Sequence, residues 1–312
     1  MRVTIHGAGA LGSYFGALLQ NAGHDVCYVA RGPHLEAMRN DGLRIEGSAG
    51  RIRLDKVRAV ATIAEAGPAD LVLFAVKNYD VERSAADLAA SIDPEALIFT
   101  VQNGVSAQPR LAGIFGPDRV LPGVVRLPAD IRSPGVVRVP AESEMGGLMF
   151  GTYDGAPSER ARAVIGKLID SGIGAKLSDD IWRALWEKYI PLSAFSATTT
   201  MARLDIGPIR ETAASRRLLR SLIAETATVA RADHPSVPET AADAAFDFLM
   251  SVPADIHSSM LDDLLRGKRL ELDWLSGEVV RRGERLGVPT PAHAFTCAVL
   301  APHAAGRPDS GH

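Results

Sequence analysis

Gly7-Ala8-Gly9-Ala10-Leu11-Gly12 is the stretch of sequence that decides the fold of this chain. It follows the apolar run Arg2–His6, which has the length of a β-strand, and it opens a helical pattern at Leu11–Ala22. In a glycine turn of this spacing, the first glycine permits a tight turn and the second lets the backbone approach a pyrophosphate. The third lets the helix pack closely on the sheet. The alternative is a glycine-rich turn without a ligand, but the strand and helix on either side favour a dinucleotide-binding turn.

The first 178 residues alternate short apolar runs with helical or turn segments. We predict strands at Arg2–His6, Asp25–Ala30, Leu71–Val76, Leu97–Val101, Arg119–Arg126, Gly135–Val139, Gly147–Gly151 and Gly174–Leu177, and a helix at Pro157–Ser171. Apolar strands that alternate with helices indicate a parallel sheet covered on both faces. We therefore expect an α/β fold in which residues 1–178 form a Rossmann-type, doubly wound, NADP-binding domain.

The rest of the chain, residues 179–312, shows helical periodicity and no convincing strand. We predict helices at Asp179–Met201, Ile209–Ala232, Ala241–Leu249, Ser258–Leu265 and Glu271–Leu286, and another that begins at Pro291. Ser178 is the predicted N-cap of the first of these helices, because serine side chains accept hydrogen bonds from first-turn amides. The polar tail Gly306–His312 is predicted to fray. These residues are expected to form an all-α domain for substrate binding or dimerisation.

Composition excludes several classes of protein. The net charge is −3 over 312 residues, and no basic stripe points to a nucleic-acid partner. The longest apolar run, Leu71–Val76, is far shorter than the ~20 residues of a membrane span. Two cysteines, Cys27 and Cys297, cannot form a disulfide framework, so we expect a reducing cytoplasm. The glycine-rich N-terminus is interpreted as mature structure because it makes a poor signal peptide.

Several kinds of catalytic site are also unsupported. The eight histidines include no His-x-x-x-His pair, and no Cys-x-x-Cys occurs, so no metal is predicted. The sequence has neither a Walker-type loop nor a Gly-x-Ser-x-Gly nucleophile turn.

The end of the second predicted strand indicates which nicotinamide cofactor would bind. An acidic residue there would bind a ribose 2′-hydroxyl, whereas arginine accommodates a 2′-phosphate. Asp25–Ala30 is followed by Arg31, with no acid beside it. A guanidinium fork suits a phosphate, although a solvated loop arginine is the alternative. We therefore predict NADPH rather than NADH.

Polar residues follow two further predicted strands. Lys77 comes directly after Leu71–Val76, and Asn103 lies two residues after Leu97–Val101. In a doubly wound sheet the ligand lies beyond the carboxyl ends of the strands, so Lys77 could reach a phosphate or carboxylate and Asn103 a carboxamide or substrate oxygen. The alternative is that both are ordinary turn residues, since Asn-Gly is a common turn dipeptide.

Lys188 lies on the apolar face of the predicted helix Asp179–Met201. Burial would lower the pKa of a lysine and suit it to general acid catalysis, whereas a lysine at the rim of the face would extend to water. Glu271 is the carboxylate that we consider as a partner for a buried cation. The alternative is that Glu271 is an ordinary first-turn glutamate, which the helix dipole stabilises. Ser258 and Ser259 open another helix and could simply be caps.

Together these residues resemble the ketopantoate reductase (2-dehydropantoate 2-reductase) family over nearly the whole chain. The segments that match in order and approximate spacing are Gly7–Gly12 with Gly16, Arg31, Ala75-Val76-Lys77, Gln102-Asn103-Gly104, Leu185-Trp186-Glu187-Lys188, Ser258-Ser259-Met260 and Glu271-Leu272-Asp273. The resemblance implies that NADPH reduces the 2-oxo acid 2-dehydropantoate to D-pantoate, a step of pantothenate biosynthesis, in a cleft between the domains.

The resemblance also implies roles for individual residues. The cofactor would be held by Gly7, Ala8, Gly9, Ala10, Leu11, Gly12 and Arg31, with Lys77 and Asn103 beside it. Lys188 and Glu271 would be the catalytic residues, with Lys188 as the general acid that protonates the carbonyl oxygen. The substrate would be bound by Asn103, Lys188, Ser259, Glu271 and the residues at positions 192 and 196. The expected partner is a small-molecule 2-oxo acid, and a homodimer is the assembly that we consider.

One departure from the family concerns the substrate pocket. Well-studied members carry asparagines four and eight residues after the catalytic lysine, where this chain has Leu192 and Ser196. Ser276 similarly stands where an asparagine is frequent. Lost hydrogen bonds to a substrate can discriminate strongly between analogues. The alternative function is therefore a related D-2-hydroxy-acid dehydrogenase for a more apolar 2-oxo acid, and a non-catalytic NADPH-binding sensor is a third hypothesis.

Overall fold

The computed structural model describes residues 1–47, 50–139, 148–154, 156–171 and 174–307. The chain forms two compact units, and each is described by itself. The first unit comprises Met1–Gln102 and Ala107–Ile181, and the second comprises the chain from Trp182 together with the segment Asn103–Ser106. The sequence predicts a domain boundary after Ser178, and nothing in it indicates that Asn103–Ser106 belongs with the second unit.

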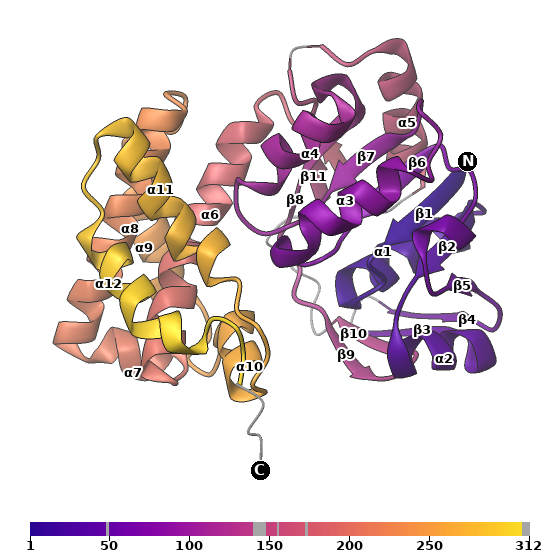
Figure 1. Ribbon diagram of the computed structural model, residues 1–312. Coiled ribbons are helices and arrows are strands. Elements are labelled where there is room, and N and C mark those ends of the chain that lie inside the picture. Colours follow the sequence, from indigo (N-terminus) through magenta and orange to yellow (C-terminus); the bar gives the residue numbers. More distant parts are fainter. Residues whose placement is uncertain (48–49, 140–147, 155, 172–173, 308–312) are drawn as a thin grey trace. The chain divides into compact units, whose positions relative to one another are not determined.

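The first unit is an α/β domain, as Figure 1 shows. Its elements in chain order are β1 (Arg2–His6), α1 (Ala10–Asn21), β2 (Asp25–Val29), α2 (Gly32–Asp41), β3 (Leu43–Gly47), β4 (Gly50–Leu54), β5 (Arg58–Val60), β6 (Leu71–Phe74), η2 (Asn78–Asp80), α3 (Val81–Ala89), β7 (Leu97–Thr100), α4 (Ala107–Phe115), β8 (Val120–Val125), β9 (Asp130–Ser133), β10 (Val136–Val139), β11 (Leu148–Phe150), α5 (Glu159–Asp170) and β12 (Ala175–Leu177).

The large sheet has eight strands in the order β12-β11-β8-β7-β6-β1-β2-β5. From β5 to β8 all neighbours are parallel, whereas β11 is antiparallel to β8. The chain winds outward from β1 through β2 to β5, and then returns to the other side of β1 to continue through β6, β7 and β8. The order therefore reverses between β1 and β6, and in such sheets a ligand binds at the carboxyl ends of the strands at this switch point.

Helices cover both faces of this sheet, because successive side chains of a strand point to opposite faces. Within β6, Leu71 and Leu73 belong to one buried cluster, which also contains residues of α1 and α5. Val72 and Phe74 belong to another, which contains residues of α3 and α4. Figure 1 shows α3 and α4 in front of the sheet. The doubly wound sheet predicted from the sequence is confirmed.

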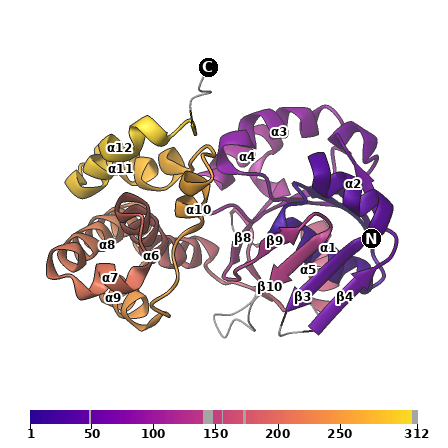
Figure 2. The same cartoon turned by 90° about the horizontal axis from the view of Figure 1, so that it is seen from below.

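A second sheet of four strands, in the order β4-β3-β10-β9, was not predicted. It pairs the hairpin β3–β4 with the hairpin β9–β10 through a parallel contact between β3 and β10 (Figure 2). Helix α1 contacts β3, β4 and β10 as well as β1 and β2 of the large sheet, so it packs between the two sheets. The first helix after the glycine turn is thus enclosed on two sides.

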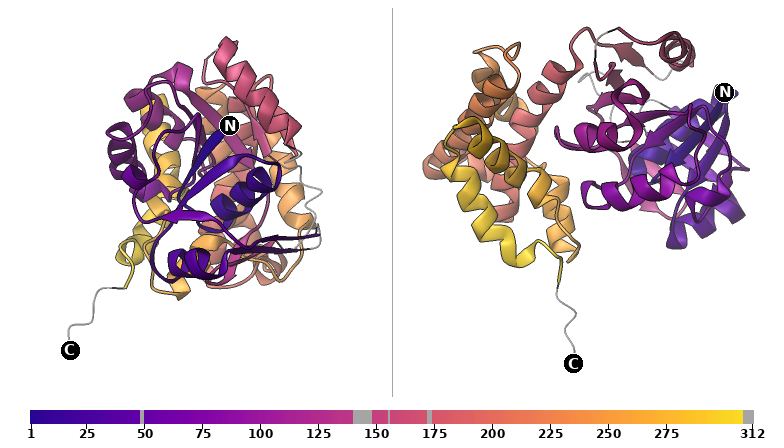
Figure 3. Two further views of the ribbon diagram at one scale, coloured as in Figure 1. Left: turned by 90° about the vertical axis from the view of Figure 1, so that its right-hand side faces the viewer. Right: turned by 45° about the horizontal axis from the view of Figure 1, so that its top comes forward.

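The second unit contains helices and no strand among its described residues (Figure 3). Its elements are α6 (Ile181–Ala202), α7 (Ile206–Glu211), α8 (Ala213–Asp233), α9 (Ala241–Ser251), α10 (Ser259–Leu265), η4 (Leu272–Trp274), α11 (Ser276–Leu286) and α12 (Pro291–Leu300). Helix α8 contacts α7, α9, α11 and α12. Trp186 and Tyr189 on α6 are fully buried and are among the largest core side chains of this unit.

The structure corrects three local predictions. The helix expected at Ile209–Ala232 is two helices, because the backbone of Thr212 is extended (φ −80°, ψ 117°). The helix expected at Glu271–Leu286 is a 3₁₀ turn followed by α11, with Leu275 between them at φ −101° and ψ −98°. Ser178 does not cap α6, since its Oγ accepts a hydrogen bond from the amide of Asp180, before the helix begins.

Two further predictions reach beyond the described residues. The strand expected at Gly147–Gly151 is observed as β11, and Gly147 itself lies outside the described part of the chain. The same holds for residues 308–312 of the tail that was predicted to fray.

Gly42, which joins α2 to β3, offers a test of this packing. It has φ +77°, and a Cβ there would lie 2.0 Å from the carbonyl oxygen of Leu54. We expect Gly42→Ala to lower the free energy of unfolding by about 2–4 kcal/mol, because backbone strain and overpacking add. Gly23 also has a positive φ (+86°) but nothing within 4 Å, so Gly23→Ala should cost only about 1–2 kcal/mol. Urea denaturation measures both; equal losses would contradict the close contact at Gly42.

Candidate active site

The glycine turn lies at the carboxyl end of β1, beside the end of β6. Gly7 has φ +99°, and a Cβ there would lie 2.8 Å from the backbone of both Ala75 and Val76. A Cβ at Gly12 would lie 2.4 Å from the carbonyl oxygen of Gly7, so α1 starts in direct contact with the turn. A Cβ at Gly9, in contrast, would meet nothing within 4 Å. Two glycines therefore serve packing, and the third leaves open space at the N-terminus of α1.

This open space suits the phosphates of a dinucleotide. Gly9 caps α1, and the first amides of a helix carry partial positive charge and lack intrahelical partners. Nearby in the fold, Gln102 follows β7 and donates its side-chain amide to the carbonyl oxygens of Phe74 (2.8 Å) and Val76 (3.2 Å). Its Oε1 is buried and accepts no hydrogen bond from the described residues. An unpaired buried acceptor at this edge of the sheet fits a ligand that brings a donor.

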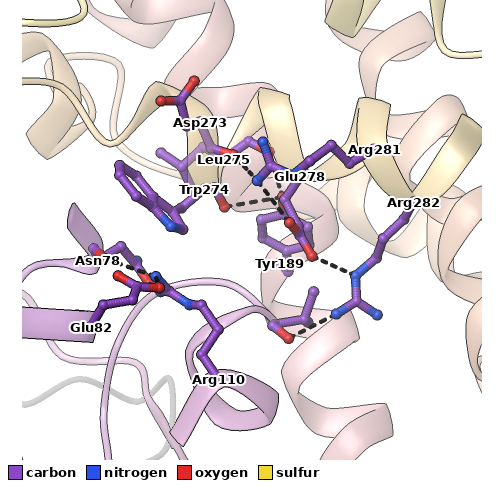
Figure 4. A network of polar contacts seen from close by, with 11 residues as sticks. Asn78, Glu82, Arg110, Tyr189, Asp273, Trp274, Leu275, Glu278, Arg281 and Arg282 are labelled. Carbon is purple, nitrogen blue, oxygen red and sulfur yellow. Dashed lines mark hydrogen bonds and ion pairs between the residues drawn. The ribbon is translucent and has the colours of Figure 1, made fainter. Parts of the chain in front are cut away.

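Lys77 is held from both sides. Gln102 binds the backbone just before it, and Arg110 of α4 binds the residue just after it. Arg110 donates to the carbonyl oxygen of buried Asn78 at 3.1 Å, to Asn78 Oδ1 at 2.9 Å and to Glu82 Oε1 at 2.8 Å (Figure 4). Lys77 itself is half-buried and begins the η2 turn. These bonds define the backbone from which the Lys77 side chain extends.

Arg31 is exposed at the N-cap of α2, directly after β2. The turn and β2 are joined by a hydrogen bond from the amide of Ala8 to the carbonyl oxygen of Val29 at 2.8 Å. The first unit therefore carries the predicted cofactor residues: Gly7, Ala8, Gly9, Ala10, Leu11, Gly12, Arg31 and Lys77. Asn103 is the exception, because it belongs to the second unit.

The contrast between Gly9 and Gly12 separates ligand binding from folding. We expect Gly12→Ala to destabilise the protein by about 1–3 kcal/mol, because its methyl group would overlap the turn. Gly9→Ala should change stability by no more than about 1 kcal/mol, since alanine is merely a poorer cap. Its methyl group would occupy the open space, so it should raise the Kd for NADPH at least about tenfold. Isothermal titration and denaturation measure these effects; unchanged NADPH binding by Gly9→Ala would contradict a phosphate site here.

Asn103 and Lys188 meet in the second unit. The Lys188 Nζ on α6 donates a hydrogen bond of 2.8 Å to Asn103 Oδ1, although the two residues are 85 positions apart. Lys188 is half-buried, so its ammonium lies at the edge of the apolar packing of α6. The side-chain amide of Asn103 orients the ammonium while bringing no negative charge. Two predicted site residues from distant parts of the sequence are thus in direct contact.

The segment Asn103–Ser106 is anchored by a charged network. The guanidinium of Arg282 on α11 pairs with Glu278 at 2.7 Å (Figure 4). It also donates to the carbonyl oxygen of Val105 at 3.0 Å and pairs with Asp233. The Arg282, Glu278 and Asp233 side chains are only 13%, 12% and 17% exposed, so these pairs are shielded from water. Charge-assisted hydrogen bonds of this kind are stronger than neutral ones.

Tyr189 completes the anchor. Its fully buried hydroxyl donates to the carbonyl oxygen of Leu275 at 2.5 Å, and burial raises its pKa well above the usual value, so that it stays a donor. The Tyr189 ring lies 3.5 Å from the position of a Cβ on Gly104, whose φ is +88°. The same hydrogen bond accounts for the irregular backbone at Leu275, where a continuous helix was predicted.

The remaining substrate-side predictions also lie in the second unit. Leu192 is half-buried and Ser196 is buried, both on α6. Ser258 caps α10, accepting from the amide of Leu261 and sharing a hydrogen bond of 2.9 Å with Thr199, whereas the side chain of Ser259 is exposed. Glu271 is buried, with 7% of its surface exposed.

Sequence reasoning missed the residues that hold the site in place. Arg282, Tyr189 and Arg110 bind backbone carbonyl oxygens, to which no sequence motif corresponds. Gln102 is part of the segment Gln102-Asn103-Gly104, but no role was predicted for it. The spacing of Glu278 and Arg282 by four residues was a visible signal of a helical ion pair.

Arg282→Lys tests the anchor because it keeps the charge but loses the fork that binds three partners at once. We expect a loss of about 1–3 kcal/mol in the free energy of unfolding. We also expect faster hydrogen exchange at the amides of Gly104 and Val105, measured by mass spectrometry. The matched control is Arg217→Lys, at an exposed position of α8, which should stay within about 0.5 kcal/mol. Unchanged exchange in Arg282→Lys would mean that Arg282 does not hold this segment.

A doubly wound sheet with a glycine turn at its switch point is typical of dinucleotide-binding oxidoreductases. Family models agree: residues 3–155 match "Ketopantoate reductase PanE/ApbA", and residues 180–304 match the C-terminal model of that family. The chain belongs to the ketopantoate reductase family.

Individual relatives agree with this assignment. The chain is 34% identical to a 2-dehydropantoate 2-reductase of Archaeoglobus fulgidus over 290 residues, which cover 92% of each chain. The crystal structure of a PanE/ApbA family ketopantoate reductase from Ralstonia eutropha JMP134 superposes with a TM-score of 0.87 at 32% identity, over 97% of this chain and 99% of that one. A D-mandelate dehydrogenase solved with NADH and anilino(oxo)acetate has a TM-score of 0.86 over 97% and 98% of the two chains; at 21% identity it shares the fold.

Membrane-spanning helices and metal-binding clusters are both absent from the described ranges. No helix there has both the length and the hydropathy that a membrane crossing requires. No group of three or more histidine, cysteine, aspartate or glutamate side chains there is arranged to hold a metal ion.

Proposed function

We propose that this chain reduces 2-dehydropantoate to D-pantoate with NADPH, as a step of pantothenate biosynthesis. The observation that carries the proposal is the 2.8 Å hydrogen bond between Lys188 Nζ and Asn103 Oδ1, which forms a half-buried, oriented proton donor in the second unit. The relative from Archaeoglobus fulgidus bears the name of this activity and aligns over 92% of its length.

The chemistry of the reaction requires a proton donor. NADPH supplies a hydride to the 2-oxo carbon when it is bound. Negative charge then develops on the carbonyl oxygen, and a nearby ammonium both stabilises that charge and donates a proton. Lys188 is the general acid of this proposal. Asn103 accepts a hydrogen bond from the Lys188 ammonium and so orients it as a proton donor.

The other residues divide between the cofactor and the substrate. The turn Gly7–Gly12 would hold the pyrophosphate, Arg31 the 2′-phosphate, and Lys77 a further anionic group. Glu271 would accept a hydrogen bond from a substrate hydroxyl, and Ser259 would bind near the substrate carboxylate. The exposure of Ser259 supports this choice, because its neighbour Ser258 is already occupied as a helix cap.

A second candidate is a related D-2-hydroxy-acid dehydrogenase that acts on a more apolar 2-oxo acid. Half-buried Leu192 lies one helical turn after Lys188 and cannot form hydrogen bonds, which favours an apolar substrate side chain. The preference for NADPH, the cytoplasmic location and the homodimer remain predictions from the sequence.

The test is an NADPH-oxidation assay over a panel of 2-oxo acids that includes ketopantoate, 2-oxoisovalerate and phenylpyruvate. We expect the highest kcat/KM with ketopantoate; turnover of the apolar acids without ketopantoate would support the second candidate instead. Lys188→Ala should lower kcat by about 10²–10⁴-fold while leaving the Kd for NADPH nearly unchanged. The matched control is Lys268→Ala, at an exposed position of the same unit, which should retain wild-type kcat. A Lys188→Ala enzyme within a few-fold of wild type would exclude Lys188 as the acid.

A further inference from the structure

A chain of three hydrogen bonds leads from the second sheet to the glycine turn. The amide of Gly135, in the turn between β9 and β10, donates to His34 Nδ1 at 3.0 Å. His34 Nε2 lies 3.2 Å from Ser13 Oγ, and Ser13 Oγ lies 3.1 Å from the carbonyl oxygen of Ala8. Ser13 and His34 are buried, with 0% and 9% of their surfaces exposed. All four residues belong to the first unit.

The direction of every bond in this chain is determined. A backbone amide can only donate, so His34 Nδ1 must be the acceptor and the ring proton of the neutral imidazole must lie on Nε2. His34 therefore donates to Ser13 Oγ, and the Ser13 hydroxyl is left to donate to the Ala8 carbonyl oxygen, which can only accept. Burial lowers the pKa of His34, which keeps the ring in this neutral form. Each of the three hydrogen bonds therefore has only one possible direction.

The bonds connect two parts of the predicted cofactor site that are not adjacent in sequence. Ala8 lies inside the glycine turn, whereas His34 lies in the first turn of α2, whose N-cap is Arg31. A link through Ser13 to Ala8 thus sets the position of the α2 N-terminus, and with it the Arg31 backbone, relative to the turn. Ala8 is held from the other side as well, because its amide donates to Val29 at the end of β2.

We propose that His34, acting through Ser13, is a positioning residue that fixes the spacing between Arg31 and the glycine turn and so determines the preference for NADPH over NADH. The inference rests on the proposed function, and specifically on Arg31 as the 2′-phosphate residue. NADPH would be held at two points at once, by the turn and by Arg31. A ligand held at two points gains from a preorganised spacing, whereas NADH has no 2′-phosphate and gains nothing from the position of Arg31.

The test measures cofactor binding to the purified full-length chain by isothermal titration, without substrate. For each variant the readout is the ratio of the Kd for NADH to the Kd for NADPH. Ser13→Ala and His34→Gln should each lower this ratio by about three- to tenfold, the effect of one or two lost hydrogen bonds. Ser91→Ala is the matched control, because its hydroxyl also donates to a backbone carbonyl, that of Asp87, and its ratio should equal that of the wild type.

A merely structural role would give a different result. It would lower the melting temperature and weaken both cofactors equally, and an unchanged ratio in Ser13→Ala would overturn the inference. If His34 acts through Arg31, Ser13→Ala should have no further effect on the ratio in an Arg31→Ala background; additive effects would overturn that route. Should His34→Gln fail to fold, Ser13→Ala decides the question alone.

The same data separate this inference from the proposed function. A wild-type chain that binds both cofactors equally would overturn the role of Arg31 and this inference together. A wild-type chain that prefers NADPH but reduces no 2-oxo acid would contradict the proposed reaction, while the ratios of the variants would still decide the role of His34.

Discussion

The close approach of the Gly7 backbone to the chain after β6 is the constraint on which the cofactor unit depends. No side chain fits at Gly7, so β1 and β6 run side by side and end at the same place, where the strand order reverses. Helix α1 must begin at once, which directs its first amides to this edge of the sheet. The residues that follow β6 then emerge beside the turn, and Gln102 and Arg110 hold the backbone on either side of Lys77.

Much of the fold could be predicted because its strongest determinants are local. The apolar runs of β1, β2, β6 and β7 and the glycine turn fall within short windows of sequence, and the structure places all of them close to the predicted positions. The second sheet was not predicted because it joins two hairpins that are far apart in sequence, through the pairing of β3 with β10 some ninety residues later. The helix break at Leu275 was not predicted because it involves a tertiary contact, the hydrogen bond from the Tyr189 hydroxyl to the Leu275 carbonyl oxygen.

In the candidate site, too, local features could be predicted from the sequence and tertiary contacts could not. Residue type and position indicated the turn, Arg31, Lys77, Asn103 and Lys188, since each follows a strand or interrupts an apolar face. The supporting residues could not be found in this way, because Arg282, Tyr189 and His34 act through backbone groups of distant segments. A backbone carbonyl or amide is present at every position of the chain, so it leaves no mark in the sequence. The candidate residues could be predicted from the sequence, whereas the contacts that hold them in place are seen only in the structure.

The bond between Arg282 and Val105 has a consequence for biosynthesis. It joins residues 177 positions apart, and Arg282 lies near the end of the chain. Because a chain emerges from the ribosome at about 5–20 residues per second, residues 103–106 are made many seconds before the arginine that anchors them. The first unit can form its sheet in that interval, but residues 103–106 cannot be anchored until Arg282 has been synthesised. A protein truncated after α8 would therefore possess the lysine and the asparagine of the site but not the arginine that anchors the loop of the asparagine.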